Sequence, residues 1–232
     1  MLEESVDYLV DSGVQTPLIL LILVVLEAVL SADNAIALAA IAQNLPDPKL
    51  QRQALNIGLL GAYILRISLI LAATWIVKFW QFEFIGACYL LWLVFDYFTS
   101  SKEETENKTS TDKAINFSSL WQIVPTIAMT DLAFSLDSVT TAIAVAEDTW
   151  LIITGGTIGV ITLRFLAGIF IRWLQEYTHL EDAGFITVGF VGLRLLLKAV
   201  LPDLIIPEWI TISFIFILFI WGFSERRVEN SN

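Results

Sequence analysis

Seven apolar segments, each close to the length of a membrane-spanning helix, dominate this sequence. A helix needs roughly 20 mostly apolar residues to cross the hydrocarbon core of a bilayer. Hydrophobic residues make up 56% of the chain and its mean hydropathy is +0.73, which is higher than soluble domains of this size carry. The sequence therefore predicts an all-α, polytopic membrane protein with seven transmembrane helices. The expected spans cover residues 17–43, 55–79, 82–99, 119–147, 150–174, 183–201 and 204–223.

Two polar motifs lie inside apolar segments, and the second repeats the first. Glu27–Asn34 reads EAVLSADN and Asp131–Ser138 reads DLAFSLDS. Each motif has an acid at its first place, Ser at its fifth, Asp at its seventh and a small polar residue at its eighth. This shared spacing points to an internal duplication. The matched pairs are Glu27 with Asp131, Ser31 with Ser135, Asp33 with Asp137, and Asn34 with Ser138.

A second block is duplicated behind each motif. The segment GLLGAYILR ends at Arg66 and GTIGVITLR ends at Arg164, and both contain two glycines at the same spacing, which are expected to let helices pack closely. Blocks that recur in the same order indicate a repeated unit of about three helices. Because each unit holds an odd number of helices, the second copy enters the membrane from the opposite face. The two repeats are therefore expected to be inverted, an architecture common in secondary transporters.

A polar linker divides the two copies. It contains SKEETENKTSTDK, a composition that predicts a mobile loop. The chain is expected to divide into an acidic N-terminal tail, a first three-helix repeat, a cytoplasmic linker, a second three-helix repeat, and a seventh helix with a cytoplasmic C-terminal tail. These parts cover residues 1–16, 17–99, 100–118, 119–201 and 202–232, respectively.

The basic residues outside the apolar core predict the orientation. If the helices alternate in direction, only Lys78 and Lys198 lie on one side of the membrane. Because cytoplasmic loops carry the excess of Lys and Arg, the N-terminus is expected outside and the C-terminus in the cytoplasm. The expected location is the inner (plasma) membrane, with a thylakoid as the alternative. The basic residues on the cytoplasmic side are Lys49, Arg52, Lys102, Lys108, Lys113, Arg172, Arg226 and Arg227.

The charged residues inside the predicted spans need compensation. Each costs roughly 2.5 to 3.5 kcal/mol at the centre of a helix on insertion scales. Arg66 and Arg164 are expected to pair with motif carboxylates and keep them ionised, and Arg194 to pair or to reach the interface. On a straight helix Asp33 points about 120° away from Glu27. We therefore expect the first helix to unwind near the motif; the alternative is that Asp33 faces its counterpart in the second motif.

The donor groups of the motifs suit a hard or borderline divalent cation. Cys88 is the only cysteine and His179 the only histidine, so a metal site must be built from oxygen. Carboxylate, amide and hydroxyl oxygens favour Mn²⁺, Mg²⁺ or Ca²⁺. The net charge of −11 argues against a nucleic-acid partner. The alternative interpretation is that polar residues in membrane helices only join helices to one another.

These motifs resemble those of the TerC family, integral membrane proteins first named for tellurium resistance. The resemblance rests on EAVLSADN, on the NLP that follows at Asn44–Pro46, and on DLAFSLDS, and it covers about residues 15–223. It implies a role in metal-ion transport, most often Mn²⁺ export and manganese homeostasis. The implied ion-binding positions are Glu27, Asp33, Asn34, Asp131, Asp137 and Ser138, and the supporting residues are Ser31, Ser135, Arg66 and Arg164.

The sequence thus predicts a transporter, not an enzyme, that exports Mn²⁺ and has no resident cofactor. Exchange against protons is the hypothesis for its energy source, because acids cluster inside the membrane. The expected partners are the ion, the lipid bilayer and, as a further candidate, other membrane proteins. Three alternatives stay open: an intramembrane aspartyl protease, a membrane-protein assembly or metal-homeostasis factor that transports nothing itself, and a Ca²⁺/cation exchanger.

Overall fold

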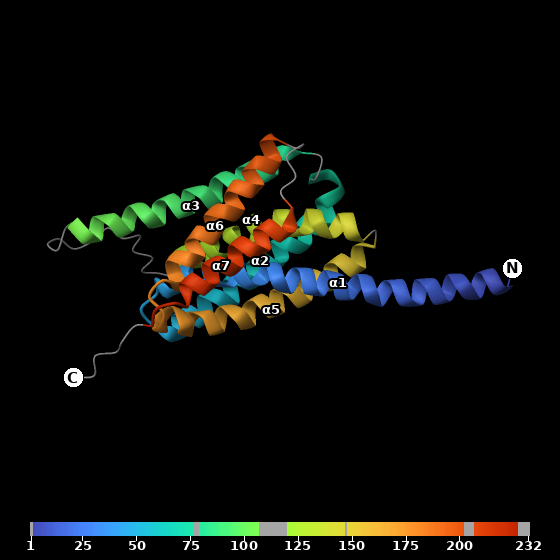
Figure 1. Ribbon diagram of the computed structural model, residues 1–232, viewed down its shortest axis with the longest axis horizontal. Helices are drawn as coiled ribbons and strands as arrows, with labels where there is room; N and C mark the ends of the chain where they lie inside the picture. The colour runs from blue at the N-terminus through green and yellow to red at the C-terminus, as the bar shows by residue number, and fades with distance from the viewer. Residues whose placement is uncertain (1, 77–78, 107–119, 147, 202–206, 227–232) are drawn as a thin grey trace.

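Seven helices make up the part of the chain that the structure describes. The computed structural model describes residues 2–76, 79–106, 120–146, 148–201 and 207–226, with the backbone alone at 2–15, 26, 29–30, 32–33, 73–76, 100–106 and 208–209. The helices gather into a bundle, and the first part of α1 extends beyond it (Figure 1). Their bounds are α1 (Leu2–Gln43), α2 (Pro48–Ile76), α3 (Trp80–Glu106), α4 (Leu120–Val145), α5 (Thr149–Glu176), α6 (Leu180–Val200) and α7 (Glu208–Gly222).

Five of these helices are long and apolar enough to cross a membrane, namely α2 to α6. Shorter apolar stretches lie in α1, at Thr16–Val25 and Asn34–Gln43, and in α7, at Ile210–Gly222. The all-helical class predicted from the sequence is therefore confirmed for the described residues, which contain helices and no strand.

Three helix boundaries differ from the expected spans by more than four residues. α1 begins at Leu2 instead of residue 17, and α2 begins at Pro48, because proline is well tolerated in the first turn of a helix. α3 continues to Glu106, so the prediction of a loop is wrong for residues 100–106, where Glu and Lys are good helix formers. The remainder of the predicted linker, 107–118, lies outside the described residues.

The first motif does not interrupt its helix. The backbone of α1 is helical throughout Glu27–Asn34, so the predicted local break is wrong. An intact helix satisfies every backbone N–H and C=O group within the segment, whereas a break in an apolar environment would leave some of them without partners. The side chain of Asp33 is outside the described part, so the question of whether it faces Asp137 stays open.

The helices of the two halves pack in matching pairs. α1 packs mainly against α5, α2 against α4, and α3 against α6, while α7 lies against α6. If the first three helices are exchanged with the next three, the α1–α5 pair becomes the α4–α2 pair and the α3–α6 pair is unchanged. The packing thus follows the same correspondence as the repeated sequence blocks.

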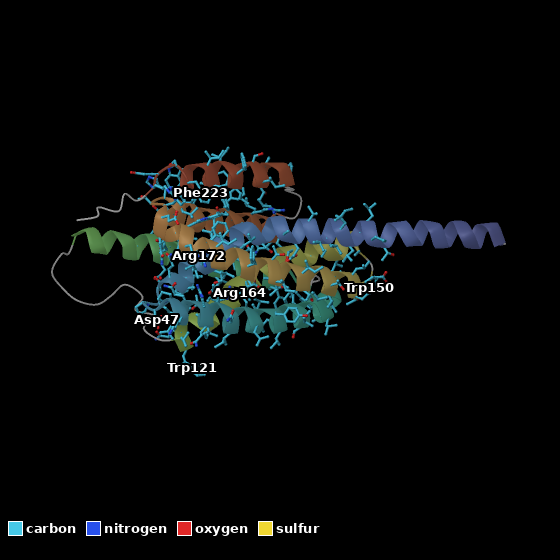
Figure 2. All side chains as sticks on the ribbon, turned by 90° about the horizontal axis from the view of Figure 1, so that it is seen from below. Asp47, Trp121, Trp150, Arg164, Arg172 and Phe223 are labelled. Atoms are coloured by element: carbon cyan, nitrogen blue, oxygen red, sulfur yellow. The ribbon has the colours of Figure 1, made fainter. Side chains whose placement is uncertain are left out.

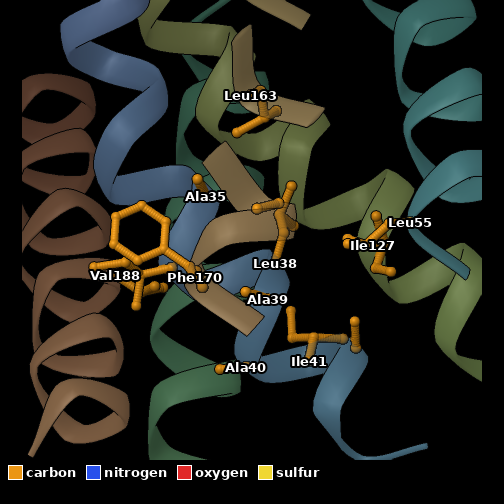
Figure 3. Close-up of a cluster of buried hydrophobic side chains, with 14 of the residues drawn as sticks. Ala35, Leu38, Ala39, Ala40, Ile41, Leu55, Ile127, Leu163, Phe170 and Val188 are labelled. Atoms are coloured by element: carbon orange, nitrogen blue, oxygen red, sulfur yellow. The ribbon is translucent and has the colours of Figure 1, made fainter. Parts of the chain in front are cut away.

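One end of the bundle holds a large apolar cluster. We call it the basic end: it contains the α1–α2 and α5–α6 connections and the residues Lys49, Arg52, Arg172 and Arg226. Here Leu38, Leu55 and Ile127 join a core of fully buried side chains (Figure 3). Ala35, Ala39 and Ala42 are also buried, as the small side chains along this helix allow. The opposite end, which we call the far end, has a smaller cluster around Leu23, Val139 and Ile152.

Candidate ion-binding site

A buried arginine joins the two motifs. Arg66 of α2 is 2% exposed, and its guanidinium forms an ion pair with Glu27 of α1. Its Nη2 lies 3.5 Å from Oδ2 of Asp131 in α4, and its Nε donates a hydrogen bond of 2.9 Å to Oγ of Ser135. The predicted pairing of Arg66 with motif carboxylates is confirmed. One side chain therefore brings the first acids of both motifs to the same place.

The carboxylates of this cluster are withdrawn from solvent. Asp131 is 0% exposed and Glu27 is 8% exposed. Oδ1 of Asp131 is buried and has no hydrogen-bond partner among the described residues. A buried oxygen left without a partner costs on the order of 1–3 kcal/mol, and more when it is charged. The cluster thus offers a free acceptor and carries one more negative than positive charge, which suits a cation.

A pocket adjoins the cluster on the side of the far end. Glu27, Arg66 and Ser138 supply its polar lining. Its apolar walls come from all four surrounding helices, and its contributors include Leu23 of α1, Ile70 of α2, Ala142 of α4 and Ile152 of α5. The pocket is small, and it places polar groups of the cluster among apolar side chains.

Close packing of α5 against α1 positions Glu27. A Cβ atom added to Gly159 would collide with Cγ of Glu27 and lie 2.9 Å from its Cδ. At the matching Gly61 of α2, an added Cβ would lie 3.7 Å from Cβ of Ala128, an ordinary contact. The repeated glycines therefore permit the expected close approach of helices, and only in the second repeat does the approach touch the site.

We expect Gly159→Ala to destabilise the protein by about 1–3 kcal/mol, because the added methyl group forces Glu27 out of its place. Gly61→Ala is the matched control, and we expect it to be neutral or stabilising by up to about 1 kcal/mol, because alanine is the better helix former. Thermal unfolding of the two purified variants in the same detergent measures the difference. Equal midpoints would show that the contact between α5 and Glu27 does not constrain the site.

Asp137 of the second motif belongs to a separate polar cluster. Its carboxylate lies 3.3 Å from Nη1 of Arg194 and 3.1 Å from Nζ of Lys198, both in α6. The same Nζ lies 3.1 Å from Oε1 of Glu83 at the start of α3. Arg194 is therefore a pairing residue, one of the two roles expected for it. No group of three or more Asp, Glu, His or Cys side chains close enough to share a metal occurs among the described residues.

Arg164 does not pair with any motif carboxylate whose side chain is described, so that prediction is wrong for Glu27, Asp131 and Asp137. Its Nε donates a hydrogen bond of 2.5 Å to Oδ1 of Asn56 in α2. Arg52 lies close enough for its positive charge to oppose that of Arg164. Arg164 lies where α5 borders α2 (Figure 2). The physical reason is that Arg66 already occupies the place between Glu27 and Asp131, while Arg164 is bonded to Asn56.

Comparison with known proteins agrees with the motifs. The profile of the family described as integral membrane protein TerC family matches residues 12–229. The chain belongs to the TerC family. The resemblance inferred from the two motifs is thus confirmed, and this TerC-family chain is a multi-pass integral membrane protein.

Relatives of this TerC-family chain occur in bacteria and in a plant. The uncharacterized membrane proteins YceF and YkoY of Bacillus subtilis are 38% and 35% identical to it over 75% and 77% of its length. The chloroplastic thylakoid membrane protein TERC of Arabidopsis thaliana is 25% identical over 75%. The aligned segments span 68%, 59% and 52% of these proteins, so much of their length is not covered. No solved structure shows significant similarity to the chain.

The TerC-family motifs thus separate into two places. Glu27, Asp131, Ser135 and Ser138 gather around Arg66, and Ser31 and Asn34 are buried along α1. Asp137 lies with Arg194 and Lys198 instead. Sequence reasoning missed Glu83 and counted Lys198 only as a loop residue. Each stands near a helix end without a repeated motif around it, and no local signal indicates that the two side chains meet.

Proposed function

We propose that this TerC-family protein is a secondary transporter that exports a divalent metal ion, Mn²⁺, from the cytoplasm. The observation that carries the proposal is the convergence of a buried carboxylate from each motif beside a pocket, where Oδ1 of Asp131 has no partner among the side chains that the structure describes. Charged side chains in membrane segments are costly and commonly mark ion pathways. The exchange of helix pairs between the halves supports seven spans built from two inverted repeats and a seventh helix.

The donor set is the argument for Mn²⁺. Glu27 and Ser138 line the pocket, and Asp131 lies beside it in contact with Arg66. These residues offer only carboxylate and hydroxyl oxygens, and such ligands suit Mn²⁺, Mg²⁺ and Ca²⁺ better than Cu⁺ or Zn²⁺. Mg²⁺ gives up its water reluctantly, which disfavours it for a site whose carboxylates are buried this deeply. Ca²⁺ is the competing substrate, and ion competition distinguishes the two.

The orientation follows from the charges at the two ends. Lys49, Arg52, Arg172 and Arg226 belong to the basic end, so this end faces the cytoplasm and the N-terminus lies outside. The pocket at Glu27 is then directed to the outside, while the apolar cluster closes the cytoplasmic half. We infer that the ion is held between the two motifs and is released when the two halves move past each other.

Flux of ⁵⁴Mn²⁺ into proteoliposomes tests the proposal. We expect saturable uptake by the wild-type protein, with Ca²⁺ and Zn²⁺ as weaker competitors. Stronger competition by Ca²⁺ would keep the mechanism and change the ion to that of a Ca²⁺/cation exchanger. Uptake that ignores an imposed pH gradient would remove the proton-exchange hypothesis. An absence of uptake by correctly folded protein would exclude transport.

A role in membrane-protein assembly, without transport, is the second candidate. The observation that favours it is that each motif carboxylate with a described side chain forms an ion pair with an arginine or a lysine. Such pairing is expected of acids that only hold helices together. It predicts that replacing Glu27, Asp131 and Asp137 together by the corresponding amides leaves biological function intact in a folded protein. The transporter proposal predicts that the same triple variant is inactive.

A further inference from the structure

Arg66 and Arg164 hold matching places in the two repeats but have different surroundings. Arg66 bridges Glu27 and Asp131, while Arg164 is partly exposed and is bonded to Asn56 of α2. The residue that matches Asn56 in the second repeat is Thr154 of α5, also a polar residue. Each arginine therefore has a candidate polar partner on the opposite helix of the α2–α5 pair. In this structure Arg164 is bonded to its partner, Asn56, whereas Arg66 pairs with the motif acids.

The two ends of the bundle also differ, because matching residues of α4 and α1 have different surroundings. The pocket is lined by Val139 and Ala142 of α4, whose matching residues in the first repeat are Ala35 and Leu38 of α1. Both Ala35 and Leu38 are 0% exposed and lie in the apolar cluster of the basic end (Figure 3). The protein therefore has a small pocket beside Glu27 on the side of the far end, and close packing at the matching place toward the basic end.

Close packing keeps the basic end closed. Gly156 of α5 lines the pocket, and its counterpart in α2 is Gly58. A Cβ added to Gly58 would lie 2.6 Å from Cγ2 of Ile127, so α2 and α4 touch there without any intervening space. At Gly156 an added Cβ would lie 3.7 Å from its nearest neighbours, the side chains of Arg66 and Ile70. α2 is thus in tight contact with α4 at Gly58, whereas Gly156 of α5 makes only ordinary contacts with side chains of α2.

We propose that Arg164 is the second counter-ion of the site, which replaces Arg66 between Glu27 and Asp131 when the bundle opens toward the basic end. The helix pairs match when the two repeats are exchanged. In that exchange Arg164 takes the place of Arg66, Glu27 takes the place of Asp131, and Asp131 takes the place of Glu27. This inference rests on the proposed transport function, because it assigns the two arginines to its two states. Arg164 is a positioning residue, since it acts by displacing the ion.

Charge balance explains why the two arginines occupy the place between Glu27 and Asp131 at different times. Two carboxylates neutralise one divalent ion, so an ion fits between Glu27 and Asp131 once Arg66 has withdrawn. If Arg66 stayed, the buried cluster would hold an excess positive charge, which is costly in a low-dielectric surrounding. When Arg164 then approaches from the other side, it competes with the ion for the same oxygens and favours release. In both states the acids of the ion-free site are paired with an arginine, so neither carboxylate is left without a counter-ion.

Cysteine labelling tests this exchange. In full-length protein carrying Cys88→Ala, a membrane-impermeant maleimide is applied to Ala35→Cys and Val139→Cys, which report on the matching places at the basic end and the far end. The measured quantity is the ratio of the labelling rate at position 35 to that at position 139. We expect Arg164→Gln to lower this ratio by about five- to tenfold and Arg66→Lys to raise it by a similar factor, a usual size for coupling in a two-state protein.

Arg172→Gln, an exposed arginine also on α5, is the matched control and should leave the ratio unchanged. An unchanged ratio in Arg164→Gln, in protein that elutes as wild type in gel filtration, would overturn the inference even if Arg66→Lys fails to fold. ⁵⁴Mn²⁺ flux in the same samples separates the two hypotheses. Flux without a shift of the ratio refutes the arginine exchange alone, whereas a shift without flux in the wild type refutes the proposed transport and leaves the exchange standing.

Discussion

Arg66→Met is expected to destabilise the protein by about 3–5 kcal/mol, because it leaves Glu27 and Asp131 buried without their counter-ion. Arg66 is 2% exposed, so water cannot replace its guanidinium. The two carboxylates would repel each other across the place that it vacates, and Ser135 would lose the hydrogen bond from Nε. The measurement is the thermal unfolding of the purified variant in detergent, compared with the wild type.

Two further variants make this result specific. Arg172→Met removes an exposed arginine and should change stability by no more than about 0.5 kcal/mol. Adding Glu27→Gln to Arg66→Met removes one of the two unpaired charges and should recover part of the loss. If Arg66→Met unfolds at the same temperature as Arg172→Met, the buried pairing does not stabilise the fold. If the added Glu27→Gln restores nothing, the loss has a cause other than unpaired charge.

Glu27→Gln by itself is expected to reduce saturable Mn²⁺ flux on the order of 100-fold, because cation affinity depends steeply on the number of charged oxygen ligands. The fold should survive, since Arg66 keeps its contacts with Asp131 and Ser135. Gln has nearly the same shape as Glu, so packing against Gly159 is retained. The measurement is the initial rate of ⁵⁴Mn²⁺ uptake as a function of concentration.

Glu83→Gln is the matched control for this flux measurement. Glu83 is also a partly buried glutamate of a transmembrane helix, but it pairs with Lys198 and does not line the pocket. We expect its flux to stay within a few-fold of the wild type. An equal loss in both variants would place the ion pathway at both clusters, and an unaffected Glu27→Gln would remove Glu27 from the site.

The partners of Arg66 and Arg164 show a limit of prediction from the sequence. Both end a block with glycines at the same spacing, and both were expected to pair with motif acids. Only Arg66 does so, because one guanidinium already serves Glu27 and Asp131. Two blocks with the same Gly and Arg spacing can thus have different surroundings when the two halves of a bundle pack differently. The spacing that the two blocks share does not contain that information.

The charges of the second cluster illustrate the same limit. The sequence predicted that Asp137 lies in a membrane span and that Arg194 needs a partner, since an isolated charge there is costly. It did not indicate that Lys198 would bridge Asp137 and Glu83, residues of two other helices. The energetic need for a partner is a local property, whereas the choice of partner depends on which helices are adjacent.

The sequence by itself determined the helical class, membrane location, family and internal duplication of this protein. These follow from hydropathy and residue spacing, which act over one helix or one motif. The tertiary structure decided that α1 stays unbroken through its motif and that Glu27 and Asp131 share Arg66. It also decided that Asp137 lies elsewhere and that the pocket is at the far end. These features depend on how distant helices pack, because burial, charge pairing and close contact at glycines are settled only when the helices meet.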